Sequence, residues 1–534
     1  MSDNKYDSIV VGGGMAGLTS AAYLARDGRS VLLIEKNSVT GGLVNSFTRD
    51  GFSFDAGVRA LLDAGIIMPM FGQLGIKLET VKSPVSLGVG DDIINIEDYS
   101  DLEEYRKLLN RLYPQSSGEI DKVLKAVRKI MKHMDVLYGI ENPVFKDIPA
   151  DRKFLFKKLL PWLPRFAFTV GKINRMNMPV EDYLDDIVSN PSLKDIISQH
   201  FFKNTPTFFA MSYFSLYLDY FYPAGGVGKL AGAVEKKVLE YGGVILNNTV
   251  AEGIDAESRF VTDSQGVKYY YNNLIWAADL KTFYNIVDIK GLSNEISGKF
   301  NDSKKLMLEN RGGDSVFTVF AEVDTDPDRF REIAHGHFFY TPLKDGLGET
   351  HRKELAELLD NFDKLERSDI LAWLDKFTRL NTYEISVPGL KDPAMAPPGK
   401  TGLIISMLAE YELFKKVSDA GWYEEFKKEF EDRIIRVISE SVYPMLKDKL
   451  IKKFSFSPLS IRDRVGSSEG AIVGWSFEKP VPVVNKIQIS DRSVYTPIPG
   501  IYQAGQWVYS PAGVPMSILT GRLAADKIIK KKKK

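Results

Sequence analysis

Residues Tyr6–Lys36 read YDSIVVGGGMAGLTSAAYLARDGRSVLLIEK, and this stretch decides the fold. Ser8 to Val11 is apolar enough to form a buried parallel strand, and Met15 to Arg26 places small residues on one face of a helix. A second strand is predicted from Ser30 to Ile34. The order strand, helix, strand predicts the first unit of a Rossmann-type α/β domain.

The turn between the first strand and the helix has the residues of a dinucleotide site. Gly12, Gly14 and Gly17 follow GxGxxG spacing. Gly12 permits the tight turn, Gly14 lets a pyrophosphate approach the backbone, and Gly17 lets helix and strand pack closely. The helix N-terminus presents free N–H groups to the phosphates, and Glu35 is placed to accept hydrogen bonds from ribose hydroxyls. A glycine-rich turn in a plain α/β unit is the alternative, but the flanking strands and the terminal acid favour dinucleotide binding.

The dinucleotide is predicted to be FAD. The pair Gly41 and Gly42, shortly after Glu35, indicates a second close backbone approach to a cofactor longer than a nicotinamide dinucleotide. Near the other end of the chain, a strand at Ile501 to Ala504 is followed by a glycine turn and a helix that opens near Val514. This second helix N-terminus joins both ends of the chain in one domain. Only one GxGxxG occurs, so no separate NAD(P)H domain is expected.

The composition excludes several kinds of site. The chain has 534 residues and no cysteine, which excludes disulfides, thiol catalysis, iron–sulfur clusters and thiolate zinc sites. The formal net charge is zero. Residues 152–175 contribute +7 and the lysines of the tail contribute +6, so the rest of the chain sums to −13, and a nucleic-acid binder coated in positive charge is not expected. His335 and His337 form an HxH pair with no third ligand in view. We interpret them as solvated loop residues and predict no metal.

One of the two basic segments, residues 152–175, reads RKFLFKKLLPWLPRFAFTVGKINR. It has seven Lys and Arg, no Asp or Glu, and five Phe and Trp. We expect it to dock on a membrane, with aromatics and leucines at the acyl boundary and bases facing anionic headgroups. Pro161 and Pro164 predict two short helical pieces. An amphipathic lid helix with merely solvated bases is the alternative.

The other basic segment is the tail, Lys527 with Lys530 to Lys534, which would add to the same attraction. No run of 18 apolar residues occurs, and the N-terminus shows no basic region or cleavage site of a secretory signal. The expected location is therefore cytoplasmic, with peripheral membrane association.

Motifs spread over almost the whole chain resemble the FAD-dependent family of phytoene desaturases, carotenoid isomerases and retinol saturases, which are relatives of the amine oxidases. The matching stretches are VVGGGMAGL, IEKNSVTGGL, GFSFDAG, YPAGGVGKLAGAV, LIWAADL, DPAMAPPGKTGL and AGQWVYSPAGVPMSILTGRLAA. The resemblance implies non-covalent FAD. It also implies an α/β fold with a Rossmann-type FAD-binding domain, a mixed-sheet substrate domain and a helical, membrane-facing subdomain.

On this basis the expected FAD domain is discontinuous and comprises residues 1–95, 222–294 and 485–534. Residues 96–221 are expected to form the helical lid or membrane-docking part. Residues 295–484 are expected to form the substrate domain.

The motif and the resemblance together assign a set of residues to FAD. Val250 matches the position where the family pairs its backbone with adenine. Gln506 departs from the family, in which many members have Asp, so binding is expected to survive with an uncharged local contact. The full set is Gly12, Gly14, Met15, Ala16, Gly17, Glu35, Lys36, Gly41, Gly42, Leu43, Val250, Ala277, Gly505, Gln506, Gly513, Val514 and Pro515.

The resemblance also places four residues near the flavin face, as catalytic candidates: Arg59, Glu469, Trp507 and Tyr509. Each is a possible proton donor or orienting group. For Arg59 and Glu469, a structural or surface ion pair is an equally good interpretation.

The aromatic run Phe201–Pro223 suits an elongated apolar tunnel, although any single aromatic is more simply a core residue. The expected function is that of an FAD-dependent oxidoreductase acting on C=C bonds of a carotenoid, retinoid or other isoprenoid, by desaturation, saturation or cis-trans isomerisation. One alternative is a flavin amine oxidase or porphyrinogen oxidase with a soluble substrate. Another is a non-catalytic prenyl-lipid-binding module of the same fold.

Overall fold

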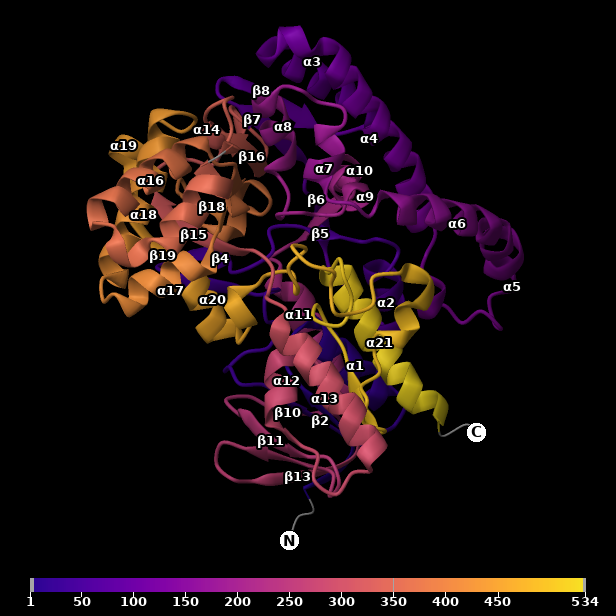
Figure 1. Ribbon diagram of the computed structural model, residues 1–534. Helices are drawn as coiled ribbons and strands as arrows, with labels where there is room; N and C mark the ends of the chain where they lie inside the picture. Colours follow the sequence, from indigo (N-terminus) through magenta and orange to yellow (C-terminus); the bar gives the residue numbers. More distant parts are fainter. Residues whose placement is uncertain (1–3, 349, 532–534) are drawn as a thin grey trace.

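The computed structural model describes residues 4–348 and 350–531. It has two large sheets and a group of helices, and each occupies its own part of the molecule (Figure 1). The sheet built from the two ends of the chain lies at the bottom of the view, and the second sheet lies at the upper left. The α/β class expected from the sequence is confirmed, with mixed strand directions in both large sheets.

The first sheet has eight strands, and its central strands are parallel. Strand β20 pairs in parallel with the end of β13, so the last strand of the chain joins the first sheet as predicted. The strands are β10 (Val244–Leu246), β2 (Val31–Ile34), β1 (Lys5–Val11), β13 (Lys268–Trp276), β12 (Phe260–Asp263), β11 (Ala251–Asp255), β14 (Val287–Asp288) and β20 (Ile501–Gln503).

Helices cover both faces of this sheet. Because side chains alternate along a strand, Val10 and Leu33 enter the core on one face while Ile9 and Leu32 enter the core on the other. The first face packs against α1 (Met15–Arg26), α11 (Gly228–Glu240) and α21 (Val514–Lys531), and the second face packs against α12 (Leu280–Ile286) and α13 (Asn294–Glu309). The predicted strand–helix–strand unit is confirmed.

The second sheet has seven strands and is mixed, because β7 pairs in parallel with β16 while its other pairings are antiparallel. Its strands are β19 (Leu450–Phe456), β15 (Ser315–Val323), β18 (Thr401–Ala409), β17 (Tyr383–Ser386), β16 (His337–Thr341), β7 (Val85–Val89) and β8 (Asp92–Ile96). One expectation is wrong here: residues 85–95 were assigned to the cofactor domain, yet they extend this sheet. The division of the chain into three parts otherwise stays a proposal.

One face of the second sheet is covered by helices around a large apolar core. These helices are α14 (Asp328–Arg331), α15 (Leu355–Asp360), α16 (Arg367–Leu380), α17 (Tyr411–Asp419), α18 (Tyr423–Glu440), α19 (Leu446–Lys449) and α20 (Pro458–Val465). The other face turns toward the rest of the molecule. Small sheets bridge the two halves: β3 (Ser46–Arg49) with β4 (Phe52–Asp55), and β5 (Leu61–Leu62) with β9 (Tyr220–Pro223) and β6 (Thr80–Lys82).

The helical part lies at the upper right of Figure 1 and has its own apolar core. Its longest helix, α4, begins at Ser117 and ends at Tyr138. The other helices are α3 (Leu102–Leu112), α6 (Leu160–Ile173), α7 (Val180–Asp185), α8 (Pro191–Ser198), α9 (Thr207–Ala210) and α10 (Tyr213–Leu218), and α2 (Ile67–Leu74) belongs to the core beside the first sheet.

The basic segment 152–175 is one unbroken helical run, which corrects the prediction of two separate pieces. Helix α5 (Arg152–Phe154) continues through a π-helical stretch at Leu155–Leu159 into α6. Pro161 lies in the first turn of α6, directly after the π-helical stretch, where a missing N–H costs little. Pro164 is accommodated inside α6.

The lysine tail lies only partly within the described residues. Lys527 pairs with Asp491 at 3.0 Å, and Lys530 lies 3.6 Å from Asp526, so these two bases already have acidic neighbours. Lys532 to Lys534 lie outside the described residues.

Candidate active site

Three glycines form the turn between β1 and α1. Gly12 has φ +103°, and a Cβ there would lie 2.7 Å from Ala277 O. A Cβ at Gly17 would lie 1.8 Å from Gly12 O, so only glycine lets α1 pack this closely on the turn. At Gly14, by contrast, no described atom other than its chain neighbours lies within 4 Å of the position of a Cβ. The backbone at Gly14 therefore faces open space that a phosphate can occupy.

A second pair of glycines lies against this turn. Gly41 and Gly42 have φ values of +110° and +58°, and Gly41 N–H donates to Gly13 O at 2.8 Å. No side chain caps the N-terminus of α1, whose first turn points into the same space. Backbone N–H groups of an uncapped helix end are ready donors for an anion.

Glu35 closes the edge of this space with a buried carboxylate. Its Oε2 accepts from Gly13 N–H at 2.7 Å, and its Oε1 accepts from Asn37 N–H at 2.8 Å. Asn37 Nδ2 also donates to Oε1, at 2.9 Å. An ionised carboxylate has about four acceptor positions, so about one remains for a ribose hydroxyl. Lys36 lines the same space, but its Nζ donates to Asp463 O at 2.8 Å. We call Gly12–Gly17, Glu35, Gly41 and Gly42 the cofactor cradle.

The tertiary structure brings the residues assigned to FAD together around one cavity. All of them line it except Gly17, whose role is helix packing, as predicted. The two chain ends meet here: Gly505, with φ +106°, follows β20, and Val514 begins α21. The open approach at Gly14 and the acceptor capacity of Glu35 fit the pyrophosphate and ribose of FAD.

The cavity continues well beyond the cofactor cradle and has a volume of about 990 Å³. Its far part is lined largely by rings from the helical subdomain, among them Trp162, Phe166, Phe209 and Tyr213. Trp162 and Phe166 stack with centroids 4.3 Å apart, and Phe209 meets Tyr213 edge-on at 5.6 Å. This lining suits an apolar ligand with extended π surface.

The second sheet gives the cavity a polar strip from His337 on β16, Glu384 on β17 and Ser406 on β18, and Arg59 lies beside Ser406. We call these four residues the substrate wall. His337 Nε2 lies 3.0 Å from Glu384 Oε1, and Arg59 Nη2 donates to Ser406 Oγ at 2.9 Å. Apart from Arg59, none of these residues was singled out as a site residue from the sequence. In YEIS, Glu384 alternates with Tyr383 and Ile385, a pattern normally typical of a strand with one solvent-facing side.

The ionisation of the pair His337 and Glu384 follows from its surroundings. Burial lowers the pKa of His337, although Glu384 opposes this shift. Burial by itself would raise the pKa of Glu384, but the hydrogen bond from His337 and the charges of Arg59 and Lys391 hold that pKa below its usual range. At neutral pH the imidazole is therefore neutral and donates from Nε2 to an ionised carboxylate.

His337 also corrects the interpretation of the HxH pair as solvated loop residues. His337 is the first residue of β16 and only 2% of it is exposed. It lies on the side of the sheet that faces the cavity. His335 lies outside the cavity lining, with Nε2 3.0 Å from Glu97 Oε1. Within residues 4–348 and 350–531 no cluster of three or more His, Asp or Glu could hold a metal ion.

Of the four catalytic candidates, three line the cavity. Arg59 is buried and donates to Asp55 O at 2.6 Å, so its guanidinium is firmly held. Trp507 and Tyr509 are buried beside the C-terminal glycine turn, and Trp475 Nε1 donates to Trp507 O at 2.9 Å. Burial raises the pKa of Tyr509, which keeps its hydroxyl protonated.

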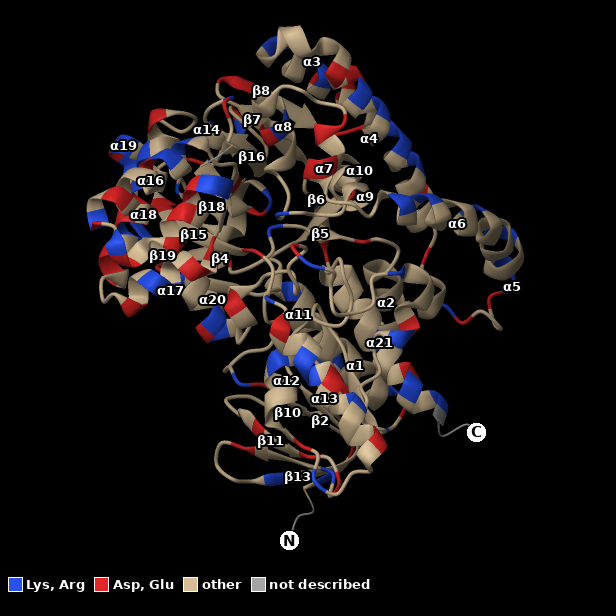
Figure 2. Cartoon of the chain, viewed as in Figure 1, with Lys and Arg blue, Asp and Glu red and all other residues tan. Residues whose placement is uncertain are grey.

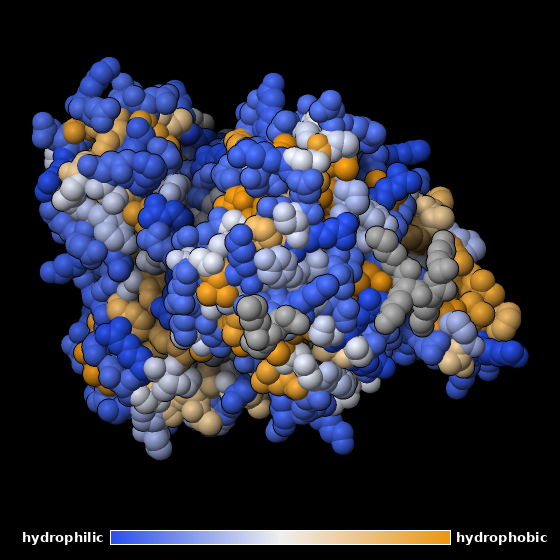
Figure 3. Space-filling view, turned by 90° about the horizontal axis from the view of Figure 1, so that it is seen from below, coloured by the Kyte–Doolittle hydropathy of each residue, from blue (hydrophilic) through white to orange (hydrophobic). Residues whose placement is uncertain are grey.

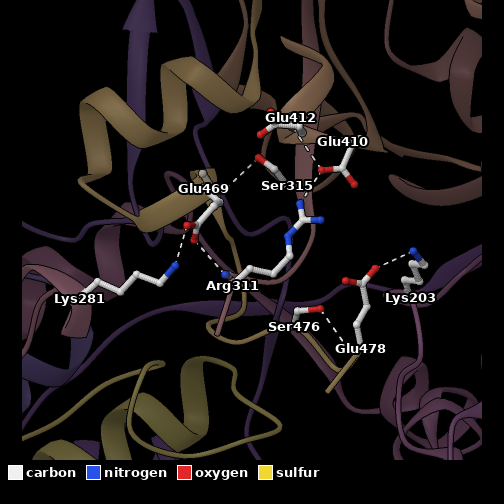
Figure 4. Close-up of polar contacts among 11 residues, drawn as sticks. Lys203, Lys281, Arg311, Ser315, Glu410, Glu412, Glu469, Ser476 and Glu478 are labelled. Atoms are coloured by element: carbon white, nitrogen blue, oxygen red, sulfur yellow. Dashed lines mark hydrogen bonds and ion pairs between the residues drawn. The ribbon is translucent and has the colours of Figure 1, made fainter. Parts of the chain in front are cut away.

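Glu469 does not line the cavity. Its Oε1 accepts from Lys281 Nζ at 2.6 Å and its Oε2 accepts from Gly312 N–H at 2.8 Å (Figure 4). Arg311 lies close by, paired with Glu410, within the same cluster of charges. This arrangement matches the structural ion pair that the sequence left open, and we no longer assign Glu469 a catalytic role.

A Rossmann-type domain built from both ends of the chain, a glycine cradle and an adjoining apolar cavity define an FAD-dependent oxidoreductase. The family model described as flavin containing amine oxidoreductase matches residues 15–529. The chain therefore belongs to the flavin-containing amine oxidoreductase family, and its cofactor is FAD.

Relatives that align with 99% of the chain include a retinol reductase and a prolycopene isomerase. The chain is 21% identical to the all-trans-retinol 13,14-reductase of Macaca fascicularis, covering 99% of this chain and 86% of the relative. It is 25% identical to the chloroplastic prolycopene isomerase 1 of an Oncidium hybrid cultivar, covering 99% and 85%. Among solved structures, a putrescine oxidase mutant superposes with a TM-score of 0.62 at 12% identity, covering 99% of both chains. At that identity the superposition supports the fold alone.

Proposed function

We propose that the protein acts on C=C bonds of an apolar polyene or related isoprenoid, by desaturation, saturation or cis-trans isomerisation. The observation that carries the proposal is the single cavity that joins the cofactor cradle to an aromatic-lined space. FAD supplies hydride or electron transfer when bound. Two of the similar proteins, the retinol reductase and the prolycopene isomerase, have polyenes in their names, which supports the same class of substrate here.

The protein's own side chains bind and orient such a substrate. Rings such as Phe208, Phe209 and Tyr213 offer faces and edges to a conjugated chain, and burial of apolar surface contributes about 25 cal/mol per Å². Tyr509 and the substrate wall provide the polar groups that can hold or donate a proton beside the reacting carbons, while the apolar rings exclude water.

We further propose that the substrate enters from a membrane surface through segment 152–175. Trp162 and Phe166 line the cavity, whereas Phe156 and Phe168 on the same helical run are 63% and 66% exposed. Figure 3 shows apolar surface on the projection at the right, where Figure 1 places α5 and α6. A helix with one side in the cavity and another at the surface is suited to guide a lipid between them.

The bases of this segment support an anionic surface as the partner. Figure 2 shows no acidic residue on α6, and none of the seven bases forms an ion pair with a described residue. Each base near an anionic leaflet contributes about 1 kcal/mol. No helix in the described residues is long and apolar enough to cross a bilayer. We therefore propose peripheral association, with the exposed rings at the acyl boundary.

The test is incubation of the purified, flavin-loaded protein with a panel of carotenoids, retinoids, fatty acids, amines and porphyrinogens, read by mass spectrometry and chromatography. Loss of two hydrogens identifies desaturation, gain of two identifies saturation, and unchanged mass with altered retention identifies isomerisation. Conversion of amines or porphyrinogens instead would favour a soluble-substrate oxidase. A purified protein without flavin absorbance would favour a lipid-binding module. No conversion of any polyene would contradict the proposal.

A further inference from the structure

Glu384 is the carboxylate on the cavity wall that a substrate can reach. Tyr383 and Ile385 are buried in the core on the opposite face of the sheet, so Glu384 points to the cavity, with 35% of its side chain exposed there. Away from the cofactor cradle, the other carboxylate among the described lining residues is Asp279. It is 5% exposed, and its Oδ1 accepts from Thr282 N–H at 2.8 Å, where it caps α12.

Glu384 is also held in one orientation. His337 Nε2 lies 3.0 Å from its Oε1, and the imidazole is fixed in turn by stacking on Tyr220, with centroids 5.5 Å apart and planes 8° from parallel. One oxygen is therefore engaged by His337, which leaves acceptor positions of the carboxylate for a ligand in the cavity.

A pure hydrocarbon in this cavity would displace water from an ionised carboxylate and offer no hydrogen bond in return. Leaving the second oxygen of this carboxylate without a donor is unfavourable. A carbonyl or carboxylate on the ligand offers no donor either. An ammonium would donate, but it would meet the positive charges of Arg59 and Lys391, which act on the same carboxylate. A hydroxyl donates without adding charge.

We propose that Glu384, oriented by His337, accepts a hydrogen bond from a hydroxyl group of the substrate, which is thus a polyene or isoprenoid alcohol. This inference rests on the proposed function, because it presumes that an extended apolar chain fills the rest of the cavity.

The test compares three ligands with the same polyene chain: all-trans-retinol, the hydrocarbon in which CH₃ replaces CH₂OH, and the corresponding primary amine. Dissociation constants are measured by quenching of tryptophan fluorescence in the oxidised holoprotein, without an electron donor. We expect retinol to bind about tenfold more tightly than either of the other two, as is typical when one ligand satisfies a buried polar group and another does not.

Two variants test whether Glu384 causes the preference for retinol. Glu384→Leu should weaken retinol binding about tenfold while the hydrocarbon binds at least as tightly as before, which shows that the cavity is intact. The matched control is Glu97→Leu, because Glu97 pairs with the neighbouring His335 at the same 3.0 Å distance but lies outside the cavity. That variant should keep the wild-type preference.

Equal binding of retinol and the hydrocarbon by the wild type would overturn the role of Glu384 and leave the polyene proposal standing. The same holds if Glu384→Leu retains the preference, or if the amine binds most tightly. If none of the three ligands binds, both the inference and the proposed function fail.

Discussion

The cofactor cradle and the substrate wall border one cavity, yet they are encoded differently. The cradle comes from residues 12–42 alone, held by backbone turns that only glycine permits. The substrate wall combines side chains from Arg59, His337, Glu384 and Ser406, which come from separate strands and a loop. Local backbone geometry therefore specifies the cradle, whereas strand pairing specifies the wall. Substitutions in the two regions should therefore differ in their effects on folding and on binding.

The largest effects are expected in the cradle, where substitution of one glycine should prevent folding and substitution of another should prevent only flavin binding. Gly17→Ala should prevent soluble expression or abolish cooperative unfolding, because its Cβ would lie 1.8 Å from Gly12 O. Gly14→Ala should fold but lose most bound flavin, because its Cβ enters only the space for the phosphate. Flavin absorbance per protein and circular dichroism check both.

The control for these variants is Gly118→Ala on the exposed side of α4, where a Cβ meets no described atom within 4 Å. It should keep full flavin content and gain up to about 1 kcal/mol of stability. Normal flavin content in Gly14→Ala would contradict the assignment of the cradle.

The next largest effect is expected when the charge of segment 152–175 is reversed. Replacing Lys157, Lys158 and Arg165 by Glu should lower binding to vesicles with anionic lipid by roughly a hundredfold or more, since each reversal removes about 1 kcal/mol of attraction and adds repulsion. Sedimentation with anionic and neutral vesicles measures this. Reversing the three lysines of α13, of which Lys299 and Lys305 are exposed and Lys304 is half-buried, is the control. Unchanged binding by the first variant would refute the docking proposal.

A smaller effect is expected from lowering the pH, because a half-buried histidine, His200, lines the cavity beyond the cradle. Burial lowers the pKa of His200 to about 4, from 6.5 when unfolded. As pH falls from 7 to 5, the unfolded chain takes up a proton that folded His200 does not, so folding loses about 2 kcal/mol. His200→Gln should reduce this loss, as measured by urea unfolding at the two pH values with flavin in excess. The Gly118→Ala protein should retain it. An equal loss in His200→Gln would contradict the burial of a neutral ring.

The smallest effect is expected at Glu469, which the family resemblance placed near the flavin and the structure places in an ion pair with Lys281. Glu469→Gln should leave turnover within about threefold of wild type and reduce stability by about 1 kcal/mol, the usual cost of weakening a partly exposed pair. Steady-state kinetics on the substrate found in the panel, with urea unfolding, provide the check. A loss of turnover by two orders of magnitude would restore the catalytic assignment.

How well the site could be predicted depended on whether its residues act through the backbone or through side chains. Gly12, Gly14 and Gly41 could be recognised because a glycine at a fixed spacing has one conformational reason to be there. Glu384 could not, because alternation along β17 predicts only that it leaves the core, and both solvent and an internal cavity satisfy that prediction. Segment 152–175 was recognised by composition, but its prolines led to a wrong prediction of two separate helical pieces, because the helix continues through a π turn into α6.

The sequence by itself determined the dinucleotide unit, the joining of the two chain ends and the absence of cysteine chemistry, because turn geometry and residue type are local properties. The tertiary structure decided that residues 85–96 extend the second sheet, that Glu469 lies in an ion pair and that His337 and Glu384 meet on a cavity wall. These depend on which strands pair and at which register. Strand pairing joins residues far apart in the chain, and a local sequence pattern does not identify the strand with which a segment will pair.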